Sequence, residues 1–115
     1  MKELEHQLQV SCIKWFRIKF RNRLIYAIPN GGKRNIIIAT KLKSEGVVSG
    51  IPDLHIPISN RFYHGLYIEM KVKPNTPTDN QEALMNQLRL NGYKCEVCYS
   101  LDDFIRVVNE YMQNL

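Results

Sequence analysis

Residues 66–72 constrain the fold of this chain more than any other segment, because apolar and polar residues alternate in them with a period of two. This alternation predicts a strand with one face in the core and the other outside it. The opposite faces carry different chemistry. Glu69 and Lys71 share the polar face, and taken alone they are interpreted as a surface ion pair. The apolar face carries Leu66, Ile68, Met70 and Val72.

Other periodic segments predict seven further elements, and their order gives the fold class. The order is helix, strand, helix, strand, strand, helix, strand, helix, which predicts an α/β domain with a mixed central sheet flanked by helices. The strands within 53–72 should form an antiparallel hairpin, and the strand–helix–strand step within 66–99 should be parallel and right-handed. With 115 residues, the chain is expected to form one domain, 1–115. Helices are predicted at 3–22, 35–44, 79–90 and 101–112, and strands at 24–28, 53–58, 66–72 and 94–99.

The composition indicates whether the chain is globular, disordered, membrane-bound or secreted. Apolar residues make up 44% of the chain and charged residues 23%, which is typical of a globular protein and excludes a disordered one. No apolar run approaches the roughly 20 residues that span a bilayer, so we expect no membrane partner. The first five residues include acids and lack an apolar stretch, so we expect no signal peptide and a cytoplasmic protein.

The net charge of +5 is unevenly distributed along the chain. Residues 1–50 contain ten Lys or Arg and three acids, whereas residues 51–115 contain six Lys or Arg and eight acids. The first half therefore carries +7 and the second −2. A basic half favours a polyanionic partner such as nucleic acid. The alternative is a solvated basic helix face.

The cysteines and histidines do not predict a zinc site. Cys95 and Cys98 form a C-x-x-C motif, but the second pair that a structural zinc site usually needs is missing. In a strand these two thiols would also point to opposite faces, so we interpret them as buried core thiols. The histidines have no ligand-like spacing, and we expect surface or site-edge positions for His6, His55 and His64.

Asp53 supplies the second acid of a candidate hydrolytic centre. It follows Pro52, whose ring fixes φ and stiffens the backbone before the acid. If the two strands pair through the loop 59–65, Asp53 lies near Glu69, and the two carboxylates repel unless a cation lies between them. Mg²⁺ prefers such oxygen ligands. Lys71 then reaches the same centre, where it orients or deprotonates the attacking water or stabilises the charge of the transition state. This set of groups is what hydrolysis of a phosphodiester requires.

Pro52-Asp53 followed by Glu69-Met70-Lys71 resembles the P-D…(D/E)-x-K signature of the restriction-endonuclease-like nuclease superfamily. More narrowly, the chain resembles the VRR-NUC (virus-type replication-repair nuclease) domain family over essentially its whole length. Short motifs of this kind often arise by chance, and their order, spacing and flanking residues make the match specific. The other matching pieces are Glu5 with Gln9, Asn30-Gly31-Gly32, Ala39, Leu42, Glu45-Gly46, Gly50-Ile51, Gln81 and Gly92-Tyr93.

This resemblance implies a restriction-endonuclease-like core and a metal-dependent endodeoxyribonuclease that uses Mg²⁺ or Mn²⁺. It implies metal ligation by Asp53, Glu69 and the backbone carbonyl of Met70, with a catalytic role for Lys71. Two further residues have alternatives that remain open. Glu5 would complete the acidic site, or it is an exposed acid favoured by the helix dipole. Gln81 would lie beside the metal, or it is a solvated residue near a helix start.

The resemblance also implies the substrate and the assembly. The chain is similar to minimal stand-alone forms found in phages and bacteria, which resemble Holliday-junction resolvases and are expected to act as homodimers on branched DNA. Alternatives are a non-catalytic DNA-binding module on the same fold and a protein-interaction domain. Trp15, with Phe16 and Phe20, is expected in the core or at a dimer contact. The expected DNA contacts are the glycine loop and its basic neighbours, Asn30, Gly31, Gly32, Lys33, Arg34, Lys41 and Lys43.

Overall fold

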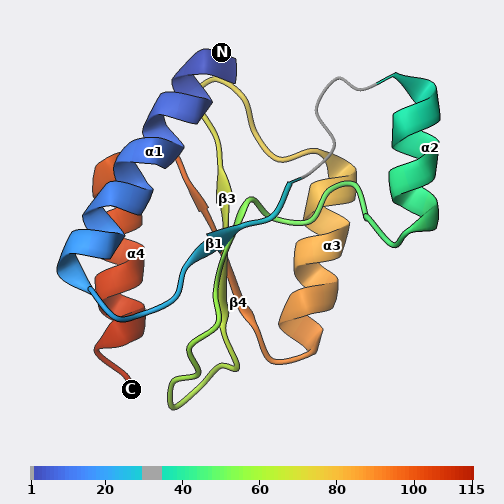
Figure 1. The fold of residues 1–115 in the computed structure, drawn as a ribbon. Coiled ribbons are helices and arrows are strands. Elements are labelled where there is room, and N and C mark those ends of the chain that lie inside the picture. Colours follow the sequence, from blue (N-terminus) through green and yellow to red (C-terminus); the bar gives the residue numbers. More distant parts are fainter. Residues whose placement is uncertain (1, 30–34) are drawn as a thin grey trace.

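A mixed four-stranded sheet in the order β1-β2-β3-β4 forms the centre of the molecule, with helices on both of its faces (Figure 1). The computed structural model describes residues 2–29 and 35–115. The order of the eight elements is the predicted one, and the α/β fold class is confirmed. Their bounds are α1 Lys2–Lys19, β1 Tyr26–Ala27, α2 Ile36–Ser44, β2 Leu54–Ile56, β3 Leu66–Met70, α3 Asp79–Leu90, β4 Lys94–Cys98 and α4 Leu101–Met112.

Strand pairing follows the predicted pattern. β2 and β3 are antiparallel, and Leu54 pairs with Ile68. β3 and β4 are parallel, with Leu66 opposite Lys94, and α3 makes the connection between them. β1 adds an antiparallel edge strand to β2. The strands are shorter than predicted, because regular pairing of β1 covers two residues and that of β3 stops at Met70.

The core lies on the sheet face that α1 and α4 cover. The alternation in β3 places Leu66, Ile68 and Met70 on this face, and each is at most 1% exposed. α1 packs against α4 and β3, and α4 packs against β4. These helices contribute their largest apolar side chains to the same cluster, namely Phe16, Phe104, Val107, Val108 and Tyr111.

The opposite face of the sheet carries the polar residues of β3 and is covered by α3 (Figure 1). Glu69 and Tyr67 lie on this face of β3, and the register brings Cys95 of β4 beside Tyr67. Met85 of α3 is fully buried and Cys95 nearly so. A charged residue on a covered sheet face is costly unless it is paired or used. Glu69 is therefore the residue that most needs explanation.

Buried thiols and rings match their predicted places. Cys12, Cys95 and Cys98 are all free and buried. Burial raises the pKa of Cys98 to about 12, so this thiol stays protonated at neutral pH. Phe16 is fully buried, and the Trp15 ring contacts Phe104 edge-on at 6.0 Å between centroids. The core assignment is confirmed for both aromatic residues.

α2 lies apart from the sheet and from the other helices of the protein (Figure 1). Asn35 caps it as predicted, since its side chain accepts a hydrogen bond from the Ile38 backbone N–H at 2.9 Å. None of its residues is buried, and Ile36 and Ile37 are 80% and 76% exposed. The helix was correctly predicted, but its apolar side chains have no core to enter within the described part of the chain.

Within residues 2–29 and 35–115, no helix combines the length and the apolar character needed to cross a membrane.

Candidate active site

Asp53 is held at the end of β2 by its backbone and its side chain. The turn before it contains Gly50 at φ +95°, a backbone conformation that favours glycine, and a Cβ atom there would also push against the Asn80 amide nitrogen at 2.4 Å. The Asp53 carbonyl accepts a hydrogen bond from Ile28 N–H at 2.8 Å. Its carboxylate Oδ2 accepts another from Met70 N–H, also at 2.8 Å. The predicted approach of Asp53 to β3 is therefore present.

Glu69 lies opposite Asp53, one step beyond the Leu54–Ile68 pair, and is only 2% exposed. Its Oε2 lies 3.2 Å from Lys71 Nζ and accepts a hydrogen bond from Gln81 Nε2 at 3.2 Å. Its Oε1 is buried and has no hydrogen-bond partner among the described residues. One oxygen of a buried carboxylate is thus satisfied by the protein and the other is left for something else.

The two acids make each other harder to ionise. The pKa of Glu69 is raised to about 7, because burial and, to a smaller extent, the charge of Asp53 raise it while Lys71 opposes both effects. Burial also raises the pKa of Asp53, while the Met70 N–H and the Lys71 charge oppose the rise. The charge of Glu5 on α1 adds a smaller rise to both. A pair of carboxylates in this state gains most from a nearby cation.

The residues around Glu69 fit a divalent metal ion. Carboxylate oxygens of Asp53 and Glu69 are suitable ligands, and the unpartnered Glu69 Oε1 has an electron pair available for a metal ion. Because N–H and C=O of one strand residue point to the same edge, the Met70 N–H bond to Asp53 also directs the Met70 carbonyl toward that acid. Within the described residues no group of three or more His, Cys, Asp or Glu side chains is arranged to hold a metal. Glu5 acts on the pair through its charge, and its predicted role in completing the acidic site stays a prediction.

Gln81 is placed by the cap of α3. Its Oε1 accepts from Thr78 N–H at 2.9 Å, and its own N–H donates to the Thr78 hydroxyl at 3.2 Å. The same side chain reaches Glu69 through Nε2. The two contacts fix the amide orientation, because one atom must accept and the other must donate. Gln81 therefore orients Glu69, so it does not act as a solvated helix-start residue.

The predicted DNA contacts are only partly described. Lys41 and Lys43 lie exposed in the last turn of α2, where both side chains are free to meet phosphates. The remaining predicted contacts lie outside the described residues: Asn30, Gly31, Gly32, Lys33 and Arg34.

An aromatic group on the same sheet face was not predicted from the sequence. His55, buried on β2, stacks on Tyr67 with 4.1 Å between ring centroids and 3° between planes. Tyr93 packs edge-on against Tyr67 at 5.4 Å. The Tyr26 hydroxyl lies 2.6 Å from His55 Nδ1. Period-two spacing puts Tyr67 on the face of Glu69 and could have indicated it, but the contacts across strands depend on register.

A mixed sheet that brings an acid after a proline, a buried acid and a lysine together at one end of adjacent strands defines a restriction-endonuclease-like α/β domain. The chain belongs to the VRR-NUC domain family, a family of nucleases, and the family model matches residues 3–102. Its structure is similar to one described as a VRR_NUC domain protein, with 28% sequence identity and a TM-score of 0.80. That match covers 96% of this chain and 88% of the other. A comparison with curated proteins gave no match. Membership of this nuclease family implies DNA as the substrate.

Proposed function

We propose that the chain is a Mg²⁺- or Mn²⁺-dependent endonuclease that hydrolyses phosphodiester bonds in branched DNA, with Asp53, Glu69 and Lys71 as its catalytic centre. The observation that carries the proposal is the buried Glu69 oxygen without a partner, facing a second buried acid and flanked by a lysine. A DNA-binding module needs no such arrangement, because burying two acids only weakens its attraction to phosphate.

Each residue has a role that follows from its position. Asp53, Glu69 and the Met70 carbonyl would hold the metal ion, which when bound would polarise the scissile phosphate and lower the pKa of water. Lys71 places its ammonium group beside Glu69, where it orients the nucleophile and offsets negative charge as the phosphate becomes five-coordinate. Gln81 keeps the Glu69 carboxylate in one orientation.

A cleavage assay tests the proposal and its substrate. We expect cutting with Mg²⁺ or Mn²⁺ and none with EDTA, and we expect faster cutting of a labelled four-way junction than of a flap or a linear duplex. Asp53→Asn removes one charge without changing size, and it should abolish cutting. Metal-independent cutting, or full activity of that variant, contradicts the site. Preference for linear duplex contradicts the branched substrate and leaves the site standing.

Two-fold assembly suits a junction, where two symmetric strands are cut. We propose a homodimer in which the exposed isoleucines of α2 take part, because a helix with no buried residue is otherwise unsupported. Ile37→Glu should convert the dimer to monomer in sedimentation velocity, while Ala39→Glu, at an exposed position about 160° around the same helix, should not. A wild-type protein that stays monomeric at tens of micromolar contradicts this assembly.

A further inference from the structure

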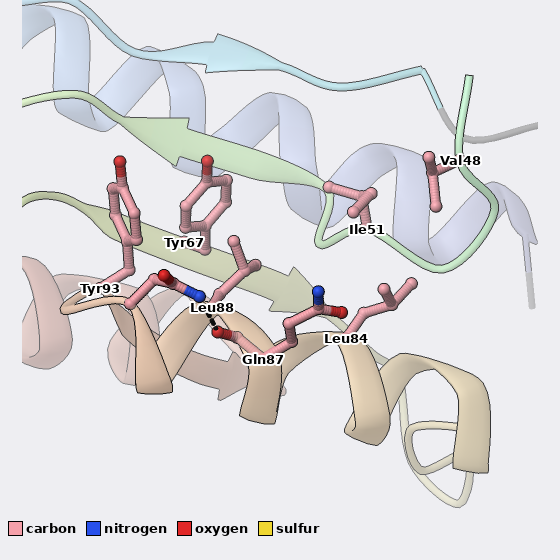
Figure 2. A pocket seen from close by; sticks show the side chains of 8 residues that line it. Val48, Ile51, Tyr67, Leu84, Gln87, Leu88 and Tyr93 are labelled. Atoms are coloured by element: carbon pink, nitrogen blue, oxygen red, sulfur yellow. Dashed lines mark hydrogen bonds between the residues drawn. The ribbon is translucent and has the colours of Figure 1, made fainter. Parts of the chain in front are cut away.

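A groove of about 640 Å³ lies between α3, β3 and the segment before β2 (Figure 2). Among the described residues, aromatic, aliphatic and amide side chains line it, and no charged side chain does. The lining residues are Val48, Ile51, Tyr67, Leu84, Gln87, Leu88, Asn91 and Tyr93.

The groove continues directly from the carboxylate centre along three separate elements. On β3, Tyr67 lies two residues from Glu69 on the same face, a distance of roughly 6.6 Å along a strand. On α3, Leu84 lies one turn after Gln81, which binds Glu69. On the third side, Ile51 lies two residues before Asp53. A polymer that places a phosphate at the carboxylates can therefore run directly into this groove.

Two tyrosine rings stand at the far end of the groove. Tyr67 and Tyr93 point their hydroxyls to the same side (Figure 2), and their ring centroids are 5.4 Å apart. The stacked His55 ring supports Tyr67 from behind, and Tyr26 holds that histidine through its hydroxyl. The rings are therefore fixed before any ligand arrives. At the rim, the exposed Gln87 amide offers donors and an acceptor, and Asn91, whose Nδ2 donates to the Gln87 backbone carbonyl at 2.9 Å, offers its amide oxygen.

We propose that this groove binds unpaired nucleobases of the DNA strand next to the phosphate that is cut. The inference rests on the proposed function and adds a substrate feature to it: a few unpaired nucleotides beside the scissile bond. Fixed aromatic rings bind bases through their faces, and amides bind base edges. A base inside a duplex has both faces covered by its neighbours, so only an unpaired base can enter. A phosphate backbone would require cations, and the part of the lining that the structure describes has none.

Binding is measured in EDTA, so that no DNA is cut. The probe is a duplex with a four-nucleotide single-stranded tail that carries 2-aminopurine, compared with a blunt duplex of equal length. We expect tighter binding of the tailed probe and quenching of its fluorescence by stacking. Tyr93→Leu should weaken tail binding about tenfold or more. Gln87→Glu, at an exposed position that does not affect the core, should weaken it several-fold and leave the melting temperature unchanged.

Matched controls separate the groove from general effects. Phe62→Leu removes an exposed ring from the β2–β3 loop, and Gln113→Glu adds the same charge at the end of α4; neither should change tail binding. Equal affinity for tailed and blunt probes, or equal effects of test and control variants, overturns the inference. It is also overturned if Tyr93→Leu changes the number of protomers and not tail affinity, because the groove is then a contact between copies. If tail binding behaves as expected but no DNA is ever cut, the groove stands and the nuclease proposal fails.

Discussion

Lys71→Met should lower the rate of DNA cleavage by roughly 100- to 10,000-fold, with little change in DNA affinity. Methionine keeps the length of the side chain but removes the ammonium group that lies 3.2 Å from Glu69 Oε2. The lost interaction is strongest when negative charge builds on the phosphate, so the effect falls on the rate and not on binding. Single-turnover cleavage and a binding assay in EDTA measure the two separately.

The matched control for this variant is Lys73→Met. Lys73 lies two residues further along, is exposed, and places its ammonium 4.1 Å from the centre of the Tyr99 ring. The Lys73→Met substitution removes the same charge from the same segment, and this variant should retain nearly full cleavage activity. Equal losses in the two variants would show that Lys71 contributes only to the overall positive field.

Glu69→Gln should inactivate the enzyme and at the same time stabilise the metal-free protein at pH 8. The pKa of Glu69 rises from an ordinary 4.5 to about 7 on folding, so above pH 4.5 the unfolded chain ionises first. The contribution of Glu69 to the free energy of unfolding is therefore present in full below pH 4.5. It is lost as pH rises from there through 7, by up to about 3 kcal/mol. Glutamine has no proton to lose, and it keeps the size of the side chain.

Urea unfolding between pH 5 and pH 8 measures this effect. His55 acts in the other direction, because burial lowers its pKa and stability falls as pH drops below 6.5. The difference between wild type and Glu69→Gln isolates the glutamate. Mg²⁺ should restore much of the lost stability at pH 8 in the wild type and little in the variant. Parallel pH curves for the two proteins, with and without Mg²⁺, would contradict the buried-acid account.

Much of the fold was predictable because local patterns agree with tertiary packing. The period of two in β3 identified both the core face and the face of Glu69. Asn35 marked the start of one helix, and of the two possible caps of α3, Thr78 and Asp79, the structure has Thr78. The strand–helix–strand spacing gave the parallel step to β4. The approach of Asp53 to Glu69 followed from pairing the two strands through the loop 59–65, and a slip of one residue would have turned the apolar residues of one strand out of the core.

The remaining features depend on contacts that no local pattern contains. Three consecutive isoleucines at the start of α2 predict burial, yet the helix lies away from the core and leaves them exposed. The Gln81–Glu69 contact needs the distance between a helix cap and a strand. The aromatic groove needs the register of three strands and the position of α3, so Tyr67 and Tyr93 look like ordinary sheet residues in the sequence.

In the β2–β3 hairpin, the distance between the two acids does not depend on the length of the connecting loop. The two acids belong to neighbouring antiparallel strands, so the gap between them is set by hydrogen bonding across the ladder and not by the connecting loop. That loop turns at Arg61 and Phe62, both exposed, and its far end lies away from the acids. Extra residues, such as a tag or a whole recognition module, can therefore be added at this tip. The distance between the two acids stays the same.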